Sequence, residues 1–325
     1  ILLGLYQMGS YRKPNQWLNL LHRPLHRLRI AGALTGAGAL LLLLAVAIPI
    51  ALVAIYQSTM TTRVVDARHW LLPLAAWLIA VSGYLAGAYA MVGNRRYSFA
   101  GFLLPNMFMY SQASGVAMLG VQLVAIVFLG VLLAIAFKPD PTAASRNPLA
   151  VLAVALPVQV GAYFLVWMLG YGVELGWTVS GTHPLNMPTP PKGGYIEADR
   201  AEGKDILLMG IADSRAPEAA LWREQIALSD VHTRYPLRNL PERNTLTNPS
   251  PLEFSDGDNN TMLVFSHDRE RFIRRGLLDN RPRGELGVGE AQAAFPAPTM
   301  PYGATYLFNA RAAYQYETEQ QRLFD

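Results

Sequence analysis

Hydrophobic residues gather in four long blocks in the first half of the chain. The blocks are Ile30–Tyr56, Trp70–Val92, Gly115–Phe137 and Leu149–Gly172. Each is mainly apolar and at least about 20 residues long, the length that a helix needs to cross a hydrocarbon core of about 30 Å. The pattern predicts an α-helical integral membrane bundle of about four complete spans, in a membrane domain that covers residues 30–173.

Two further apolar stretches do not fit this pattern. Ile1–Met8 is apolar but short, and we interpret it as the end of a fifth span that begins upstream in a longer protein. The chain closes on Q-Q-R-L-F-D without a stop signal, so we expect it to be cut there as well. Residues 98–112 contain Pro105 and Asn106 and are too short to span, which predicts an interfacial or re-entrant piece.

The pattern changes after Gly172. Residues 174–196 are rich in proline and glycine and predict a linker. A short helix is expected around Pro217–Leu228. Short runs separated by Asp, Asn, Gly and Pro predict strands in T-M-L-V-F-S, R-F-I-R-R-G-L-L, A-T-Y-L-F-N-A and A-A-Y-Q-Y-E. Residues 197–325 are therefore predicted to form a soluble α+β to mainly β domain, and short strands closing on polar turns suit part of a propeller-like repeat.

Charge divides the chain at the same place. Only 15% of the 325 residues are charged and 52% are hydrophobic. Residues 1–180 hold 11 basic and 3 acidic residues, whereas residues 181–325 hold 16 basic and 20 acidic ones. This distribution indicates a basic membrane region followed by a mildly acidic soluble one.

The short loops predict an orientation. Residues 9–29 and the loop after the second span hold seven basic residues, and the loops on the other side hold four. The positive-inside rule then places Gly9–Arg29 on the cytoplasmic side, which we expect to be that of a bacterial inner (plasma) membrane. Four spans would return the C-terminal part to the cytoplasm, and one additional crossing would reverse this.

None of the sequence motifs supports an enzymatic activity. The chain has no cysteine, no Walker loop and no dinucleotide fingerprint. S-D-G-D-N-N at Ser255–Asn260 lacks the spacing of a calcium loop, and His267–Asp268 has no nucleophile beside it. His22 and His26 alone make a weak metal site. We therefore predict no catalytic residue, cofactor or metal ion in this chain, and no nucleic-acid partner because basic patches with stacking aromatics are missing.

Polar and small residues inside the predicted spans suggest contacts within the membrane. Gly32 and Gly36 are four apart, which would let another helix approach closely. Gln122 and Gln159 are candidate pathway residues, although an interhelical hydrogen bond is the simpler interpretation. No Asp, Glu, Lys or Arg lies inside a predicted span, which argues against a proton- or ion-coupled transporter.

The segment W-L-N-L-L-H-R-P-L-H-R-L-R at Trp17–Arg29 precedes the first span. Trp17, Leu20 and Leu21 would share one side of a short helix, with the arginines pointing to water or lipid phosphate. One interpretation is a helix that anchors the chain at an anionic membrane surface. The other is a coupling element gripped by a partner subunit.

This segment, together with the spans around it, resembles the membrane subunits of type-2 ABC transporters. In that family a short amphipathic helix, a leucine pair, a proline and a basic turn lead into the next span, and Leu20, Leu21, Pro24, Arg27 and Arg29 occupy those places here. The similarity covers roughly residues 1–175. It departs from the family in the long C-terminal part and in the short stretch before the last span, which cannot hold the family's outer re-entrant helices.

The resemblance implies a permease subunit of an ATP-driven transporter with an unidentified substrate. It implies an ATP-binding partner subunit, membrane lipids around the spans, and a homodimer or heterodimer of permeases. The implied coupling residues are Trp17, Leu20, Leu21, Arg23, Pro24 and Arg27. The alternative is a non-transporting membrane anchor that carries a sensory or scaffolding β domain.

Overall fold

The structure is a computed structural model that describes most of the chain. The described residues are 1–22, 24–94, 98–109, 115–139, 147–183, 201, 203–212, 214–229, 240–246, 251–289, 291–302, 306–317 and 322–324. The chain forms two compact units. The first combines Ile1–Ala162 with Asn239–Asp325, and the second is Tyr163–Arg238.

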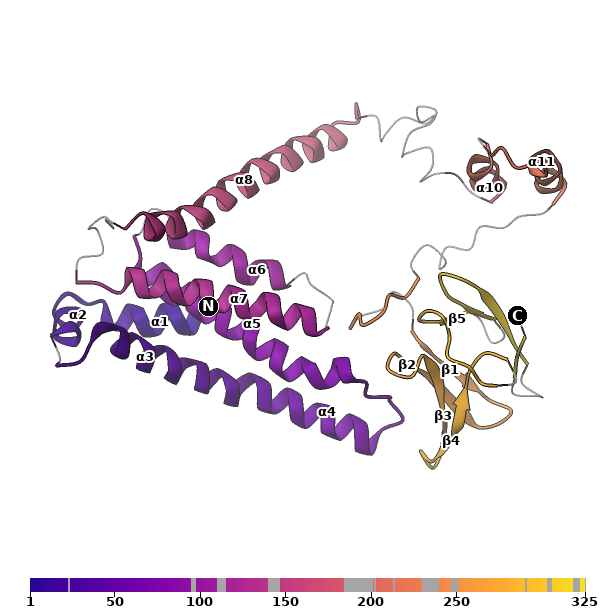
Figure 1. The fold of residues 1–325 in the computed structure, drawn as a ribbon, viewed down its shortest axis with the longest axis horizontal. Helices are drawn as coiled ribbons and strands as arrows, with labels where there is room; N and C mark the ends of the chain where they lie inside the picture. The colour runs from indigo at the N-terminus through magenta and orange to yellow at the C-terminus, as the bar shows by residue number, and fades with distance from the viewer. Residues whose placement is uncertain are drawn as a thin grey trace. The chain divides into compact units, whose positions relative to one another are not determined.

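Helices make up the first part of the chain (Figure 1). They are α1 (Leu2–Tyr11), α2 (Pro14–Leu21), α3 (Arg27–Leu42), a π-helical turn η1 (Leu43–Ala47), α4 (Ile48–Met60), α5 (Ala67–Val92), a 3-10 turn η2 (Ser98–Phe102), α6 (Leu103–Met109), α7 (Val116–Ala136) and α8 (Pro148–Val179). Four of the resulting helical stretches, Arg27–Met60, Ala67–Val92, Val116–Ala136 and Pro148–Val179, are long and apolar enough to cross a membrane. The four predicted apolar helices are confirmed, and α8 extends to Val179, into the stretch predicted as a linker.

The stretch Arg27–Met60 is continuous but changes its winding in the middle. The π-helical turn Leu43–Ala47 lies directly before Pro49. Proline has no backbone N–H to donate, and its ring clashes with the carbonyl of residue i−4. A wider turn just before the proline accommodates the ring without ending the helix.

The core of the bundle is centred on α5, which packs against α1 and α7. Gly4 and Gly87 allow α1 and α5 to approach closely. A Cβ added to Gly4 would lie 2.1 Å from the carbonyl oxygen of Tyr84, and one added to Gly87 would lie 2.3 Å from that of Ile1. Tyr84 is buried here and donates a hydrogen bond of 2.6 Å from its hydroxyl to Oε1 of Gln7. Close glycine contacts therefore bind α1 to α5 along the first turns of α1.

α5 and α7 run in the same direction. At the C-terminal end of α5, the backbone carbonyls of Met91 and Gly93 accept hydrogen bonds from Arg12. At the C-terminal end of α7, Trp17 of α2 donates from its ring N–H to the carbonyl of Lys138 at 3.2 Å. Both ends thus lie beside the segment that joins α1 to α2, so the chain between α5 and α7 must return to the opposite end of the bundle.

The return contains η2 and α6, which pack against α5 and bury Ser98, Ala100 and Phe108. Their rise adds up to only about 20 Å, less than the hydrocarbon thickness of a membrane. The sequence had indicated an interfacial or re-entrant piece because this stretch is short. The count of four spans assumed that residues 98–112 begin and end at the same end of the bundle. The parallel directions of α5 and α7 do not support that assumption.

We call the part of the chain from β1 to β8, Glu253–Phe324, the β domain. It contains two antiparallel four-stranded meanders (Figure 1). One sheet contains β1 (Glu253–Asp256), β2 (Thr261–Ser266), β3 (Arg271–Gly276) and β4 (Pro282–Leu286), and the other contains β5 (Met300–Tyr302), β6 (Tyr306–Phe308), β7 (Ala313–Glu317) and β8 (Arg322–Phe324), each in sequence order. The predicted strands correspond to β2, β3, β6 and β7. Leu263, Phe265 and Phe272 of the first sheet share one core with Leu307 and Tyr314 of the second.

A buried polar contact also joins the two sheets. The hydroxyl of Tyr316 in β7 donates a hydrogen bond of 2.7 Å to Oδ2 of Asp256 in β1. Asn259 donates to the same carboxylate from its backbone and its side chain. Burial would raise the pKa of Asp256, but these hydrogen bonds and the charge of Arg274 lower it below its usual value.

In the described part of the second unit, two short helices follow the end of α8. They are α10 (Lys204–Gly210) and α11 (Ala219–Leu228), and α11 corresponds to the helix predicted around Pro217–Leu228. Lys204 donates a hydrogen bond to the carbonyl of Ala227, which pairs the two helices.

Candidate functional site at the junction of α5 and the β domain

A buried carboxylate connects the start of α5 to the β domain. Asp66 is the N-cap residue of α5 and is only 2% exposed. Its Oδ1 accepts a hydrogen bond of 2.7 Å from the hydroxyl of Ser266, and its Oδ2 accepts one of 2.9 Å from the backbone N–H of His267. A charged acceptor that satisfies donors 200 residues away fixes the end of β2 against the first turn of α5.

A carboxylate of the β domain also binds the start of α5. Oδ2 of Asp268 accepts a hydrogen bond of 2.7 Å from the backbone N–H of Ala67. The first N–H groups of a helix have no partner within the helix, and the helix dipole favours negative charge at this end. Asp66 and Asp268 therefore both lie where the N-terminus of α5 stabilises a carboxylate.

Two arginines extend the contact. Arg68 is buried and donates a hydrogen bond to the backbone carbonyl of Thr245, and its Nε lies 3.7 Å from Oδ2 of Asp66. Arg275 of β3 donates to the carbonyl of Thr61, directly after the end of α4. We call Asp66, Ala67 and Arg68 with Thr245, Ser266, His267 and Asp268 the junction cluster.

His267 is held neutral in the junction cluster. Its Nδ1 accepts a hydrogen bond of 3.3 Å from the backbone N–H of Asn244, so its proton belongs on Nε2. Burial, together with the positive charge of Arg68, lowers the pKa of His267 to about 4. Nε2 is buried and has no hydrogen-bond partner among the described residues. Protonation of this ring would add a second buried charge next to Arg68.

Glu270 lies at the edge of the same contact. Its Oε1 pairs with Arg243 at 2.7 Å, while Oε2 is buried without a hydrogen-bond partner in the described part of the chain. Burial raises the pKa of Glu270, and the nearby charge of Arg243 opposes the shift. The carboxylates of Asp66, Asp268 and Glu270 thus accept from backbone, serine or arginine donors. Among the described residues the hydroxyl beside His267, that of Ser266, donates to Asp66 and not to the imidazole.

The neighbours His267 and Asp268 are not hydrogen-bonded to each other among the described residues, and Asp268 accepts from the backbone N–H of Ala67. No group of three or more His, Cys, Asp or Glu residues that could hold a metal ion occurs among the described residues. Of the stretch Ser255–Asn260, the first two residues end β1 and the other four form the turn to β2. What the junction cluster can do is hold two parts of the chain together, in a way that depends on charge.

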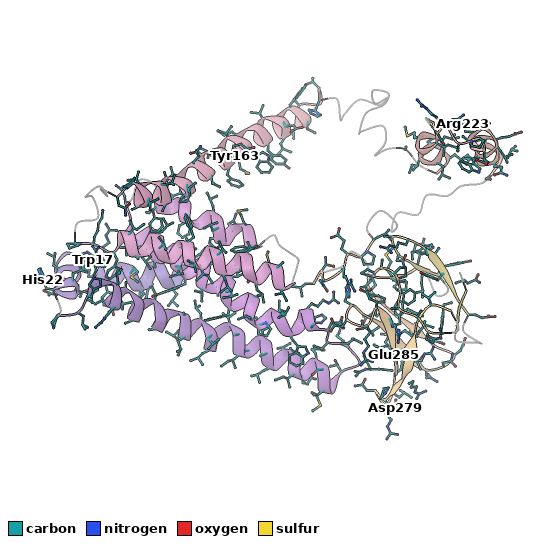
Figure 2. All side chains as sticks on the ribbon, in the orientation of Figure 1. Trp17, His22, Tyr163, Arg223, Asp279 and Glu285 are labelled. Atoms are coloured by element: carbon teal, nitrogen blue, oxygen red, sulfur yellow. The ribbon has the colours of Figure 1, made fainter. Side chains whose placement is uncertain are left out.

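The predicted coupling residues occupy the other end of the bundle, where Figure 2 labels Trp17 and His22. Trp17 and Leu20 are buried in the bundle core, and the Trp17 ring packs edge-on against Phe137 after α7. Leu21 is half-buried against the same core, and Pro24 and Arg27 are exposed. Arg23 lies outside the described residues. The aromatic face of α2 therefore contacts this chain's own α7, and Leu18 and Leu25 are exposed instead.

The residues predicted inside the spans are not brought together. A Cβ added to Gly32 or Gly36 would meet nothing within 4 Å, so the approach of another helix there stays a prediction. Gln122 is buried in α7, and its Oε1 has no hydrogen-bond partner in the described chain. Gln159 is exposed on α8. The interhelical hydrogen bonds expected for the two glutamines are not seen among the described residues.

The sequence reasoning missed Asp66 and Ser266. A signal for Asp66 was present, because it is one of three acidic residues in the first 180 and directly precedes an apolar helix, as an N-cap does. Nothing local marks Ser266 as its partner. Comparisons of the chain with protein-family models, with curated proteins and with solved structures found no match.

Proposed function

We propose that this chain is a multi-pass membrane protein that holds its β domain in a fixed position at the membrane surface opposite α2. The four long apolar helices support the membrane placement. The junction cluster carries the proposal, because Asp66 is buried between α5 and β2 with all its hydrogen-bond donors supplied by the chain itself. In this role the β domain is a scaffolding or sensory module, and the bundle is its anchor.

The helix directions support opposite sides of the membrane for α2 and the β domain. The basic segment that contains α2 lies at the C-terminal ends of α5 and α7, whereas the β domain binds the segment between α4 and α5 at the other end. With the basic segment in the cytoplasm, the β domain is extracytoplasmic. This replaces the cytoplasmic side expected from counting four spans. The shared core of the two meanders is also compatible with a partial propeller-like repeat.

Distance measurements test the fixed position. The chain has no native cysteine, so spin labels can be attached at Leu52→Cys on the exposed face of α4 and at Arg311→Cys in the turn between β6 and β7. We expect one narrow distance distribution in reconstituted protein, and a broad one after Asp66→Ala. A broad distribution in the parent protein would overturn the proposal.

A second candidate is a permease subunit driven by a separate ATPase, and the position of α2 favours it. Trp17 connects α2 to the end of α7, so a force applied to α2 would reach a long apolar helix. The partner-facing residues would then be Leu18 and Leu25, because Trp17 and Leu20 are buried.

Co-purification from native membranes tests this candidate. We expect an ATP-binding subunit to be recovered with the parent chain and lost with Leu18→Asp and Leu25→Asp combined. Leu28→Asp, which is exposed at the start of α3 on the same end, is the matched control. Absence of any ATP-hydrolysing partner from the parent preparation would reject the permease.

A further inference from the structure

The turn between β3 and β4 presents two leucines to solvent. Leu278 is 93% exposed and Leu277 is 42% exposed, although both lie in a turn with defined hydrogen bonds. The backbone N–H of Gly276 donates to the carbonyl of Arg281 at 2.9 Å, and that of Leu277 donates to the carbonyl of Asn260 at 2.9 Å. The turn is therefore built to hold its leucines outward, and within the described part of the chain nothing covers Leu278.

The turn is attached to the end of a candidate membrane helix. Arg275, at the end of β3, donates a hydrogen bond of 3.3 Å to the carbonyl of Thr61, which directly follows α4. Tyr56 near the end of α4 and Trp70 near the start of α5 are both exposed. Tyrosine and tryptophan gather at membrane interfaces, so these two residues mark the level of the lipid headgroups at this end of the bundle.

Positive charge dominates around the leucines. The charged residues from Arg275 to Arg283 are Arg275, Arg281, Arg283 and Asp279. They amount to three positive charges and one negative charge. Asp279 forms an ion pair of 3.6 Å with Arg283, and Figure 2 shows Asp279 at the tip of the β domain. Arg281 is exposed and has no ion pair among the described residues.

From these observations we infer that the β3–β4 turn docks on the lipid surface, with Leu277 and Leu278 in the headgroup region and Arg281 and Arg283 on anionic headgroups. Aliphatic side chains flanked by arginine are the residues by which protein segments bind anionic interfaces. The inference rests on the proposed membrane placement. It adds a second attachment of the β domain beside the junction cluster, one that depends on lipid composition.

Fluorescence quenching tests the inference in the full-length protein. A single cysteine at Leu278→Cys carries an environment-sensitive fluorophore, and the protein is reconstituted into vesicles that contain a lipid with a spin-label quencher below its headgroup. Arg311→Cys, in a turn of the other sheet, is the negative control, and Leu52→Cys on α4 reports on the bundle. We expect quenching at positions 52 and 278 and none at 311, with more quenching at 278 when phosphatidylglycerol is added to phosphatidylcholine.

The charge dependence gives a second measurement. With the label at position 278, Arg281→Gln should lower the ratio of docked to undocked turn about fivefold in vesicles with phosphatidylglycerol, and Arg281→Lys should retain most of it. In phosphatidylcholine alone, Arg281→Gln should change little. Equal effects in both lipids would contradict the role of anionic headgroups.

The outcomes separate the two proposals. Quenching at 52 but not at 278 overturns the docking of the turn and leaves the membrane placement intact. Absence of quenching at both positions overturns the membrane placement itself. If the thiol at 278 is shielded from a water-soluble maleimide in native membranes but is not quenched in pure lipid, the turn binds a protein instead of lipid, and the inference is wrong.

Discussion

Replacement of Asp66 by alanine should release the β domain from α5. The substitution removes the acceptor for the N–H of His267 and the hydroxyl of Ser266, and it removes the carboxylate 3.7 Å from the buried Arg68. A buried donor without an acceptor costs about 1–3 kcal/mol, and a buried charge left without its partner costs about 3–5 kcal/mol. These two costs overlap because they share one carboxylate, so we expect the docked state to lose about 3–5 kcal/mol.

Asp66→Asn provides a graded comparison. Asparagine keeps the volume and one carbonyl acceptor but removes the charge, so we expect a loss of about 1–3 kcal/mol. Asp279→Asn, at an exposed aspartate in the β3–β4 turn, is the control and should leave the junction unchanged.

Hydrogen–deuterium exchange measures the effect at the site. In Asp66→Ala, peptides that contain residues 66–70 and 265–269 should exchange faster together, while the interior of β3 keeps its protection. Because every 1.4 kcal/mol is tenfold, exchange that requires undocking should accelerate by about two to three and a half powers of ten. Unchanged exchange in both peptides would refute the assignment of Asp66 as the connection between α5 and the β domain.

Substitutions in the β domain, in the junction cluster and in the helical bundle should each have a separate effect. Tyr316→Phe removes the buried hydrogen bond to Asp256 and should lower the free energy of unfolding of the β domain by about 1.5–3 kcal/mol, measured by urea denaturation of the full chain in detergent. Because the pKa of His267 lies near 4, below its ordinary value of 6.5, the docked state should be fully stable above pH 6.5 and weaken as the pH falls towards 4. His267→Gln should remove this loss of stability in acid. The raised pKa of Glu270 acts in the opposite direction, because it favours the docked state as the pH falls. Gly87→Leu should separate α1 from α5 and destabilise the bundle by about 1–3 kcal/mol or more, which would lower the unfolding temperature of the protein in detergent. Gly120→Leu on α7, where space is open, is the control and should be tolerated.

Local pattern was sufficient for the long helices and for half of the strands. A helix of 20 or more apolar residues is determined by its own composition, so α3–α4, α5, α7 and α8 follow from the sequence. β2, with its apolar run M-L-V-F, and β7, which alternates in burial, were found. Pro282–Leu286 and Met300–Tyr302 carry proline or glycine and lack such a pattern. These strands exist because their neighbours pair with them.

Long-range contacts were beyond the sequence pattern. The pairing of Asp66 with Ser266 depends on where β2 ends in space, and no local signal encodes it. Trp17, Leu20 and Leu21 were predicted to share one side of α2, and they pack together against the bundle core, but which surface they meet could not be predicted. The end of α7 covers it, because α7 runs parallel to α5 after the short return through α6.

The central claim is that α2 and the β domain lie on opposite sides of a membrane. The most direct test labels single cysteines in intact cells with a maleimide that does not cross membranes. Leu25→Cys reports on the turn between α2 and α3, and Arg311→Cys reports on the β domain. We expect position 311 to be labelled from outside and position 25 to be labelled only after the cells are opened. Labelling of both positions from the same side would contradict it.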